Sequence, residues 1–242
     1  MTRPNFSLVM PYYNNPGMLG AHYDRWERFQ PEVKARMEIV LCDDASDEPA
    51  FTLNTGIPTR LYRIKPPHVM WSQCCATNIA ASKANGRWLV ITDIDHIVPE
   101  ETWERLAAMV LTLDSKRVYR FRRKEVDGST YKQHPNSWLM TRETFEATKG
   151  HDERYRGIYN QDAAFIERVE RVCGAISTIY PHIIRVGRET ISDASTRGEA
   201  REELYANRVE HTKKAAARRA AFKADGTYWD DTRFSAAFEE VL

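Results

Sequence analysis

Short apolar runs alternate with longer mixed segments through the first half of the chain. Each run ends in polar or turn-forming residues, as strands do; the runs are FSLVMPYY (6–13), MEIVLCDDAS (37–46), TRLYRIK (59–65) and WLVIT (88–92). Helices are predicted over about 18–29 and 71–86, and from Pro99 onward. This alternation predicts an α/β fold with a mostly parallel, Rossmann-like central sheet and helices on both faces.

The pattern changes in the second half. Residues 116–126 and part of 174–187 alternate as strands do, 137–145 reads as a strand followed by a helix, and 161–172 reads as a short helix. Residues 199–223 are rich in Ala, Arg, Lys and Glu, which predicts a long helix after a loop over 189–198. We therefore expect a helical extension at the C-terminus.

Composition restricts the class of protein. The chain has 242 residues, of which 42% are hydrophobic and 29% charged, as in an ordinary globular protein. Lys and Arg total 35 against 34 for Asp and Glu, so a nucleic acid or membrane partner would need a local patch. The start of the chain lacks a signal-peptide pattern and no run approaches the roughly 18 apolar residues of a membrane span, so we expect a cytoplasmic protein.

The four cysteines show no CxxC spacing. A zinc site or a disulfide framework is therefore not expected, and free buried thiols are. Polar residues instead gather where three predicted strands end; these clusters are Pro11-Tyr12-Tyr13-Asn14, Asp43-Asp44-Ala45-Ser46 and Asp93-Ile94-Asp95-His96. Because the carboxyl ends of parallel strands meet at one edge, we expect the three clusters to share a cleft.

Asp93 and Asp95 carry the strongest chemical signal. On an extended segment, side chains two apart point the same way, so the two carboxylates would repel unless a cation lay between them or one bound a proton. Oxygen ligands suit Mg²⁺ or Mn²⁺, which usually keep positions for substrate phosphates. The alternative is that both aspartates are loop carboxylates next to the helix at Pro99.

The segments FSLVMPYYNN, EIVLCDDASDE and ATNIAASKANGRWLVITDIDHIVP resemble, in order and spacing, the nucleotide-binding half of GT-A fold glycosyltransferases of the family-2-like kind. A further segment, KGHDERYRGIYNQDAAFIERV (149–169), resembles the acceptor-side motif of galactosyltransferases and polypeptide N-acetylgalactosaminyltransferases. The resemblance implies a single domain over 1–242. Within it, 1–100 would bind the nucleotide-sugar, 101–197 would face the acceptor, and 198–242 would form the helical segment.

The resemblance also implies the residues of a donor site. The Pro11, Tyr12 and Tyr13 backbone would line the base pocket together with Asn14, the Tyr13 ring would stack on the base, and Asp44 would accept a hydrogen bond from uracil. A second group of donor-site residues comprises Asn78, Ile94 and Asp93, of which Asp93 would contact the ribose or the metal. Asp95 would ligate Mn²⁺ or Mg²⁺. Ala76-Thr77-Asn78 stands where many relatives have Ala-Arg-Asn.

A third metal ligand is left open between two histidines. His182 in PHIIR (181–185) aligns with a ligating histidine of polypeptide N-acetylgalactosaminyltransferases, whereas a galactosyltransferase-like alignment places Val186 there. His96, next to the two aspartates, is the competing candidate.

The acceptor-side resemblance implies that Asp162 is the general base that takes the proton of the acceptor hydroxyl in an inverting reaction. Asp152 and Glu153 match the turn before it, and Gly157 and Gln161 belong to the same motif. Gln161 replaces a glutamate of the family, and Ile158-Tyr159 replaces Trp-Gly, so the acceptor is not implied. The alternative for Asp162 is an ordinary charge at a helix start.

The reaction implied is transfer from a nucleotide-sugar, namely a UDP-sugar, to a hydroxyl of a glycan, protein, small molecule or modified nucleic acid. Two basic stretches, residues 211–226 and the cluster Arg120, Arg122, Arg123 and Lys124, keep modified DNA or another polyanion open as the acceptor. Two different functions also stay open. The D-x-D after a strand is compatible with a haloacid-dehalogenase-type phosphatase, and the change at Gln161 is compatible with a noncatalytic sugar- or nucleic-acid-binding relative.

Overall fold

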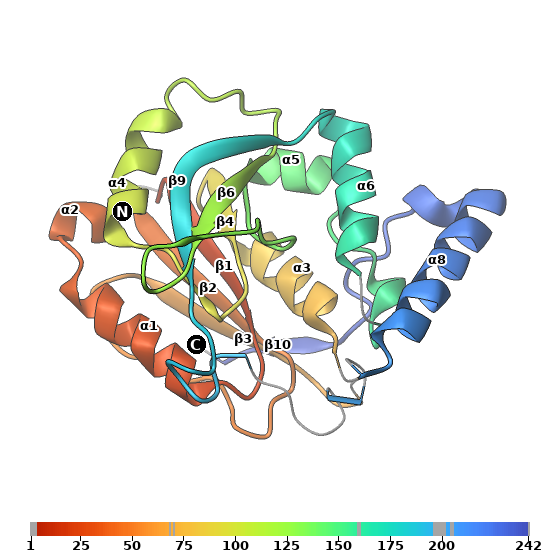
Figure 1. The fold of residues 1–242 in the computed structure, drawn as a ribbon, viewed down its shortest axis with the longest axis horizontal. Coiled ribbons are helices and arrows are strands. Elements are labelled where there is room, and N and C mark those ends of the chain that lie inside the picture. Colours follow the sequence, from red (N-terminus) through yellow and green to blue (C-terminus); the bar gives the residue numbers. More distant parts are fainter. Residues whose placement is uncertain are drawn as a thin grey trace.

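A continuous sheet lies at the centre of the computed structural model, which describes residues 4–67, 69, 71–158, 161–195, 202–203 and 206–241 (Figure 1). Its ten strands in these residues are β1 (Phe6–Tyr12), β2 (Met37–Asp43), β3 (Thr59–Ile64), β4 (Trp88–Ile91), β5 (His96–Ile97), β6 (Tyr119–Lys124), β7 (Thr130–Tyr131), β8 (Trp138–Thr141), β9 (Ser177–Arg185) and β10 (Phe238–Glu240). Their order is β10-β3-β2-β1-β4-β8-β6-β9-β5, and β7 pairs with β6.

The two halves of the chain contribute different kinds of pairing. β1 pairs in parallel with β2 and β4, and β2 pairs in parallel with β3, as the sequence pattern predicts. β8 runs antiparallel to both β4 and β6, whereas β6 and β9 are parallel. The α/β fold with helices around a central sheet is thus confirmed, and the sheet is mixed because the second half adds antiparallel strands.

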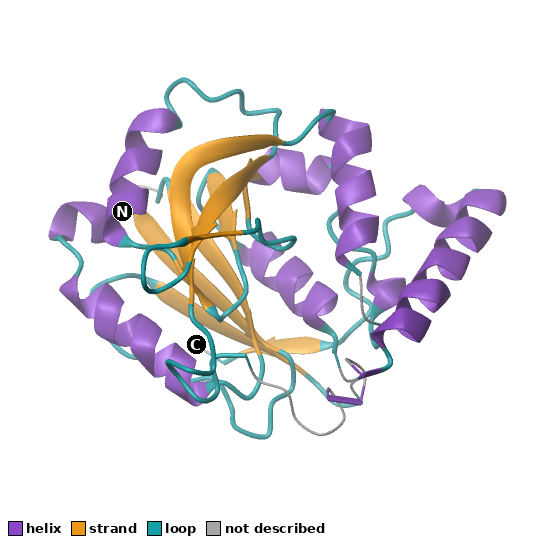
Figure 2. Cartoon of the chain, in the orientation of Figure 1, coloured by secondary structure: helices purple, strands orange, loops and turns teal. Residues whose placement is uncertain are grey.

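Helices cover both faces of this sheet (Figure 2). The helices of the described residues are α1 (Pro16–Arg28), α2 (Pro31–Lys34), α3 (Gln73–Lys83), α4 (Glu100–Met109), α5 (Arg142–Ala147), α6 (Asp162–Cys173) and α8 (Arg208–Ala224), with the 3-10 helices η1 (Glu153–Tyr155) and η2 (Thr227–Trp229). None of them is both long and apolar enough to span a membrane.

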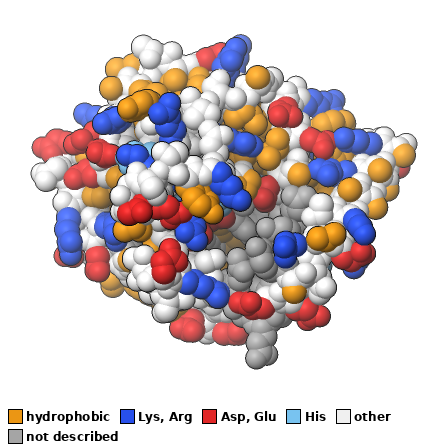
Figure 3. Space-filling view, in the orientation of Figure 1, with side chains coloured by type: hydrophobic (Ala, Val, Ile, Leu, Met, Phe, Trp, Pro, Cys, Tyr) orange, Lys and Arg blue, Asp and Glu red, His pale blue; other side chains and the backbone are white. Residues whose placement is uncertain are grey.

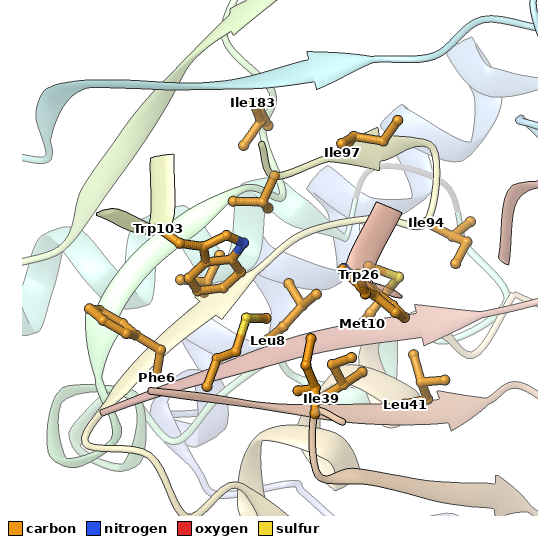
Figure 4. Close-up of a cluster of buried hydrophobic side chains, with 14 of the residues drawn as sticks. Phe6, Leu8, Met10, Trp26, Ile39, Leu41, Ile94, Ile97, Trp103 and Ile183 are labelled. Carbon is orange, nitrogen blue, oxygen red and sulfur yellow. The ribbon is translucent and has the colours of Figure 1, made fainter. Parts of the chain in front are cut away.

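The alternation of side chains along β1 builds two cores. Phe6, Leu8 and Met10 face α1 and α4, where they pack with Trp26 and Trp103 (Figure 4). Val9 faces the opposite way, into a core that includes α3, α5 and α6. Every residue of β1 is buried, because helices cover the sheet on both sides.

The C-terminal segment is only partly the helix that the sequence predicts. α8 begins at Arg208; of the predicted helix over 199–223, residues 199–201 and 204–205 lie outside the described residues. Beyond η2 the chain forms β10, which pairs antiparallel with β3 and packs Phe238 against Tyr62 with ring centroids 6.2 Å apart. A three-residue strand is too short to show a period, so the helical extension predicted for 198–242 needs this correction.

The four cysteines are free thiols, as expected, and Cys42, Cys74 and Cys75 are buried.

Candidate active site

The three polar clusters lie along one edge of the sheet. Val9 of β1 pairs with both Val40 of β2 and Ile91 of β4, so the three strands point the same way; β4 ends at Ile91, and β1 and β2 continue for three more residues. The β1–β2 register brings Tyr12 beside Asp43, and Thr92 N donates to Val9 O over 3.2 Å. The three clusters therefore lie on one edge of the sheet, and the expectation that they share a cleft stays a prediction.

Hydrogen bonds join the loops that follow β1 and β2. Asp44 N donates to Tyr12 O at 2.8 Å, and Asn14 N donates to Ser46 Oγ at 3.0 Å. Asn14 and Ala45 have φ values of 42° and 51°, in the left-handed region that L-residues rarely adopt. Strain of this kind persists only where the surroundings impose it, and it often marks functional sites.

The residues assigned to the base pocket differ in accessibility. The Tyr12 side chain is buried and its hydroxyl donates to Glu48 O at 2.8 Å, so Tyr12, like Pro11 of buried β1, can offer a ligand only its backbone. Tyr13 and Asn14 are half-buried. Asp44 is buried, and its Oδ2 accepts a hydrogen bond from Ser72 N at 2.9 Å, which ties the β2 loop to the start of α3.

Asn78 has a structural role instead of a donor-binding position. It is 0% exposed. Its Nδ2 donates to His151 O and to Glu153 Oε1, both at 2.9 Å, and its Oδ1 accepts from His151 N at 2.8 Å. The whole amide is engaged within the protein, so we leave Asn78 out of the proposed donor pocket.

Asp93 and Asp95 lie in a turn and not on an extended segment, because His96 N donates to Asp93 O at 3.1 Å. They nevertheless interact: burial first, and then the charges of Asp95 and Asp162, raise the pKa of Asp93 well above its usual value. Between them, Ile94 points its side chain into the core (Figure 4), and its carbonyl accepts a hydrogen bond from His22 Nε2 of α1 at 2.8 Å.

His96 orients Asp95. His96 Nδ1 donates to Asp95 Oδ1 at 2.7 Å, while His96 Nε2 accepts from Arg123 Nη1 at 3.0 Å, since a guanidinium can only donate. Burial alone would raise the pKa of Asp95, but His96, His134 and Arg123 outweigh it and hold that pKa at about 2. Both ring nitrogens of His96 are occupied, so His96 positions the carboxylate and is not available as a metal ligand.

His182 is not brought to the two aspartates. Its Nε2 lies 3.5 Å from Glu101 Oε1 on α4, in a separate groove. Val186, four residues further along, is the residue beside Asp95: its N–H donates to Asp95 O at 2.9 Å. Val186, and not His182, is thus the residue next to Asp95, and Val186 has no side chain that could bind a metal.

Asp93 also contacts three neutral side chains. Gln73 Nε2 donates to Asp93 Oδ1 at 2.5 Å, His134 Nε2 lies 3.5 Å from Asp93 Oδ2, and the Asn136 amide donates to the same oxygen at 3.5 Å. Burial lowers the pKa of His134 well below its usual value, so the histidine is neutral at physiological pH. No full positive charge therefore offsets Asp93 directly.

Asp162 opens α6 and faces the same small cavity as Asp93, between α3, β4 and α6. Burial raises the pKa of Asp162, while the Asn136 amide and the charge of Arg120 oppose that rise. Gln161 lines the cavity as well and accepts from Cys74 N at 3.2 Å. The structure therefore brings together Asp93, Asp162 and Gln161, although Asp93 is far from the other two in sequence.

Asp152 and Glu153 lie in a turn that is saturated with partners. Asp152 pairs with Arg154 at 2.7 Å and Arg168 at 3.0 Å, and these contacts overcome burial and lower its pKa. Glu153 is buried and accepts four hydrogen bonds, from Asn78 Nδ2, Phe234 N, Ser235 N and Ser235 Oγ.

Glycines give this turn its shape. Gly150 has a φ of 58°, and a Cβ there would lie 2.5 Å from Asn78 Oδ1. Gly157 has a φ of 75° and donates its N–H to Trp71 O at 3.1 Å, so it joins the turn to the residues before α3. Tyr159, one of the two replaced motif residues, lies outside the described residues.

Sequence reasoning missed the polar neighbours of the aspartates, namely Gln73, His134 and Asn136. Each comes from a loop or a helix start with no motif of its own. His134-Pro135-Asn136-Ser137 precedes β8 and reads only as a turn. Arg120 and Arg123 were visible as a basic cluster, but the electrostatic effect of Arg120 on Asp162 and the hydrogen bond from Arg123 to His96 depend on the position of β6 in the sheet.

Comparisons with known proteins concern the family and the fold of the chain. Residues 7–166 match the family model described as glycosyl transferase family 2. Comparison with curated protein sequences gives no match.

Solved structures share the fold. The structure of S. aureus TarS 1–349 is similar with a TM-score of 0.61 and 16% identity, over 86% of this chain and 71% of that chain. The same fragment in complex with UDP-GlcNAc matches with a TM-score of 0.61 and 16% identity, over 83% of this chain and 64% of that one. GalNAc-T7 with UDP, GalNAc and Mn²⁺ matches with a TM-score of 0.60 and 16% identity, over 87% of this chain and 51% of that chain. The chain spans 43% of the longer TarS structure. At these identities the likeness concerns the fold, which is that of GT-A glycosyltransferases.

Proposed function

The chain belongs to glycosyl transferase family 2, and from that premise we propose that it transfers the sugar of a UDP-sugar to an acceptor hydroxyl with inversion, assisted by a divalent cation. One observation carries the proposal: the carboxylates of Asp93, Asp95 and Asp162 gather at this edge of the sheet, and burial raises the pKa of both Asp93 and Asp162. Their positions match those of a donor-side carboxylate pair and a base on the acceptor side.

The donor pocket is proposed at the ends of β1 and β2. The exposed part of Tyr13 would stack on the base, the Pro11–Tyr13 backbone would line the pocket with Asn14, and Asp44 would accept from uracil. Support comes from the strained, hydrogen-bonded loops there, and from the UDP and UDP-GlcNAc in similar TarS structures.

The residues present fit a cation that is shared with the donor. Asp93 and Asp95 supply carboxylate oxygens, the ligands that Mg²⁺ and Mn²⁺ prefer. The described residues hold no group of three or more His, Cys, Asp or Glu that could bind a metal by itself, so diphosphate oxygens would complete the coordination. The ion would neutralise charge on the departing diphosphate. His182 would take part only if β9 shifted, and we give it no role here.

Asp162 is the proposed general base. As the acceptor oxygen attacks the anomeric carbon, its proton passes to the Asp162 carboxylate and the bond from that carbon to the diphosphate oxygen breaks. Burial raises the pKa of Asp162, which makes the carboxylate a better proton acceptor than an exposed aspartate. A single displacement of this kind inverts the anomeric centre.

The remaining residues of the acceptor-side motif would hold the turn and helix α6 in place. Asp152, Glu153 and Gly157 would hold the acceptor-side turn, and Gln161 would fix α6 to the start of α3. The D-x-D of Asp93 and Asp95 follows two strand–helix units and lies inside the segment that matches the glycosyltransferase family. This position does not support a haloacid-dehalogenase-type phosphatase. A noncatalytic relative would bind the donor without turnover.

Titration calorimetry with UDP tests the donor site. With Mn²⁺ present we expect binding that becomes at least about tenfold weaker when EDTA is added, and a similar loss for Asp95→Asn. Asp24→Asn, at an exposed position on α1, is the matched control and should bind as the wild type does. Equal binding with Mn²⁺ and EDTA would refute the role of the cation, and absence of UDP binding would refute the donor assignment.

A further inference from the structure

A second hollow lies on the far side of Arg123 from the two aspartates. It is a groove of about 530 Å³ between α4, β6, β7 and β9, and cations from two of these elements line it: Arg105 of α4, and Arg122, Arg123 and Lys124 of β6. Figure 3 shows Lys and Arg side chains on this side of the molecule, interspersed with Asp and Glu. Glu101 is the one carboxylate among the residues that line it.

The cations of this groove are not neutralised by the protein. Among the described residues, Arg105, Arg122 and Lys124 form no ion pair with any carboxylate, whereas nearby Arg185 pairs with Glu125 at 3.0 Å. Like charges held together without partners raise each other's electrostatic energy, and a bound anion relieves that cost. The groove is therefore suited to an anionic ligand.

An exposed tyrosine arranges the two arginines. The Arg122 and Arg105 guanidinium carbons lie 4.7 Å and 5.8 Å from the ring centre of Tyr180, which is 65% exposed. Stacking of this kind holds a guanidinium in place while its N–H groups stay available for the paired hydrogen bonds that phosphate accepts. The Tyr180 ring is also a surface on which a planar base can stack.

One layer of buried side chains separates the groove from the proposed reaction centre. Arg123 lines the groove, donates to His96 Nε2 at 3.0 Å, and His96 in turn holds Asp95 at 2.7 Å. A long ligand in the groove thus lies one side-chain layer from the carboxylates. A ligand at that place is suited to be the acceptor, not the donor.

We propose that this groove binds the phosphodiester backbone of a single-stranded nucleic acid that serves as the acceptor. The inference rests on the proposed function, since it names the acceptor class of the same site. Phosphates would pair with Arg105, Arg122 and Lys124, and a base would stack on Tyr180. This combination of a basic groove and an exposed ring is typical of proteins that bind single strands.

Fluorescence anisotropy with labelled oligothymidylate tests the proposal. The double variant Arg122→Gln/Lys124→Gln should bind at least about tenfold more weakly. The slope of its log affinity against log salt concentration should become shallower, by the amount expected for the loss of about one to two phosphate contacts. Lys213→Gln/Lys214→Gln, at two exposed positions of α8, removes the same charge from the other basic stretch and should change affinity less than about twofold. An equal loss in both variants would show charge attraction without a site and would overturn the proposal.

Two further probes separate the phosphates from the bases. An uncharged methylphosphonate oligomer of the same sequence should bind at least about tenfold more weakly, and undiminished binding would refute recognition of the backbone. Inorganic polyphosphate of matched length should bind less well than the oligonucleotide, because it offers nothing to Tyr180. Equal binding would refute nucleic acid as the ligand class.

The same preparations distinguish this inference from the proposed function. Wild-type protein is titrated with UDP in parallel, and thermal melting confirms that both double variants are folded. UDP binding without oligonucleotide binding refutes the acceptor class alone. Absence of UDP binding refutes the donor assignment, whatever the oligonucleotide does.

Discussion

Two pairs of largely buried carboxylates in this protein have opposite surroundings. Asp152 and Glu153 are fully supplied with donors: two arginines contact Asp152, and four hydrogen bonds reach Glu153. Asp93 and Asp162 contact neutral amides, and burial raises the pKa of both. Asp152 and Glu153 are buried and Asp93 and Asp162 are half-buried, and the two pairs differ above all in the partners that they contact.

Asp93 and Asp162 face polar atoms without a hydrogen-bond partner in the described part of the chain. Within the described residues, Asn136 Oδ1, Gln161 Nε2 and His151 Nδ1 are buried without a hydrogen-bond partner, and all three residues line the cavity of Asp93 and Asp162. Buried polar atoms are nearly always satisfied in folded proteins, so such a group indicates a place for a ligand or water. We expect the saturated pair to stabilise the fold and the unsaturated pair to take part in the proposed reaction.

Replacement of the Asp162 carboxylate tests this contrast most strongly. Asp162→Asn removes the proposed base but keeps the shape of the side chain, so we expect kcat to fall by about 10²–10⁴-fold. UDP affinity should stay within about threefold, because the change affects the reaction and not the donor. Steady-state kinetics with a UDP-sugar, together with calorimetry, measures both. Full transfer activity in the variant would show that another group is the base.

The corresponding change in the saturated pair should affect stability instead. Glu153→Gln replaces a charged acceptor of four hydrogen bonds and places an amide donor against Ser235 N or Phe234 N. We expect a loss of about 2–3 kcal/mol in the free energy of unfolding, measured with urea. Glu143→Gln, exposed on α5, is the control and should lose less than about 0.5 kcal/mol.

Folded Glu153→Gln protein should keep its kcat. A large fall in kcat without loss of stability would mean that Glu153 touches the acceptor, and the contrast between the two pairs would fail.

The sequence showed the carboxylates but not this division between them. Apolar runs and their polar ends predicted β1, β2 and β4 and the edge of the sheet on which both Tyr13 and Asp93 lie, because a parallel sheet fixes which strand ends come together. Hydrogen-bond partners that come from distant segments of the chain cannot be recognised from the local sequence pattern. Asn78 lies in a helix that reads as ordinary, and only the fold shows that Glu153 and His151 use its whole amide.

The surroundings of the two candidate histidines depend on contacts of the same long-range kind. Arg123 donates to His96 Nε2, and the register of β9 puts Val186 and not His182 beside Asp95. Both relations involve strands from the second half of the chain, where the alternation is weak and the pairing is mixed. The C-terminal strand β10 was missed for a simpler reason: three residues are too few to show an alternation of apolar and polar positions.

His151 lies between the two pairs and provides a pH test. Its ring stacks on Phe165 with centroids 4.1 Å apart, and burial, followed by the charge of Arg168, lowers its pKa to about 3. The unfolded chain binds a proton near pH 6.5 and the folded chain does not, so stability is full above pH 6.5 and falls as the pH drops toward 3. We expect His151 to account for a loss of about 2 kcal/mol by pH 5.

Urea unfolding at several pH values measures this loss, and His151→Phe is the comparison. Buried His22, whose pKa is lowered to about 4, contributes a loss of the same sign in both proteins. The difference between wild type and variant therefore isolates His151. Parallel pH dependences in the two proteins would show that His151 is not held neutral by the fold.

The smallest expected effect concerns Asn136, whose amide lowers the pKa of both Asp93 and Asp162. Asn136→Ala removes a hydrogen bond to the charged form of each carboxylate, so both pKa values should rise further. Because the base must be deprotonated, the acid limb of the kcat profile should move to higher pH, by about half a unit to one unit. Asn54→Ala, in the exposed loop before β3, should leave the limb in place. A shift toward lower pH, or none, would mean that the Asn136 amide does not support the charged carboxylates, and that the unsaturated pair depends on burial alone.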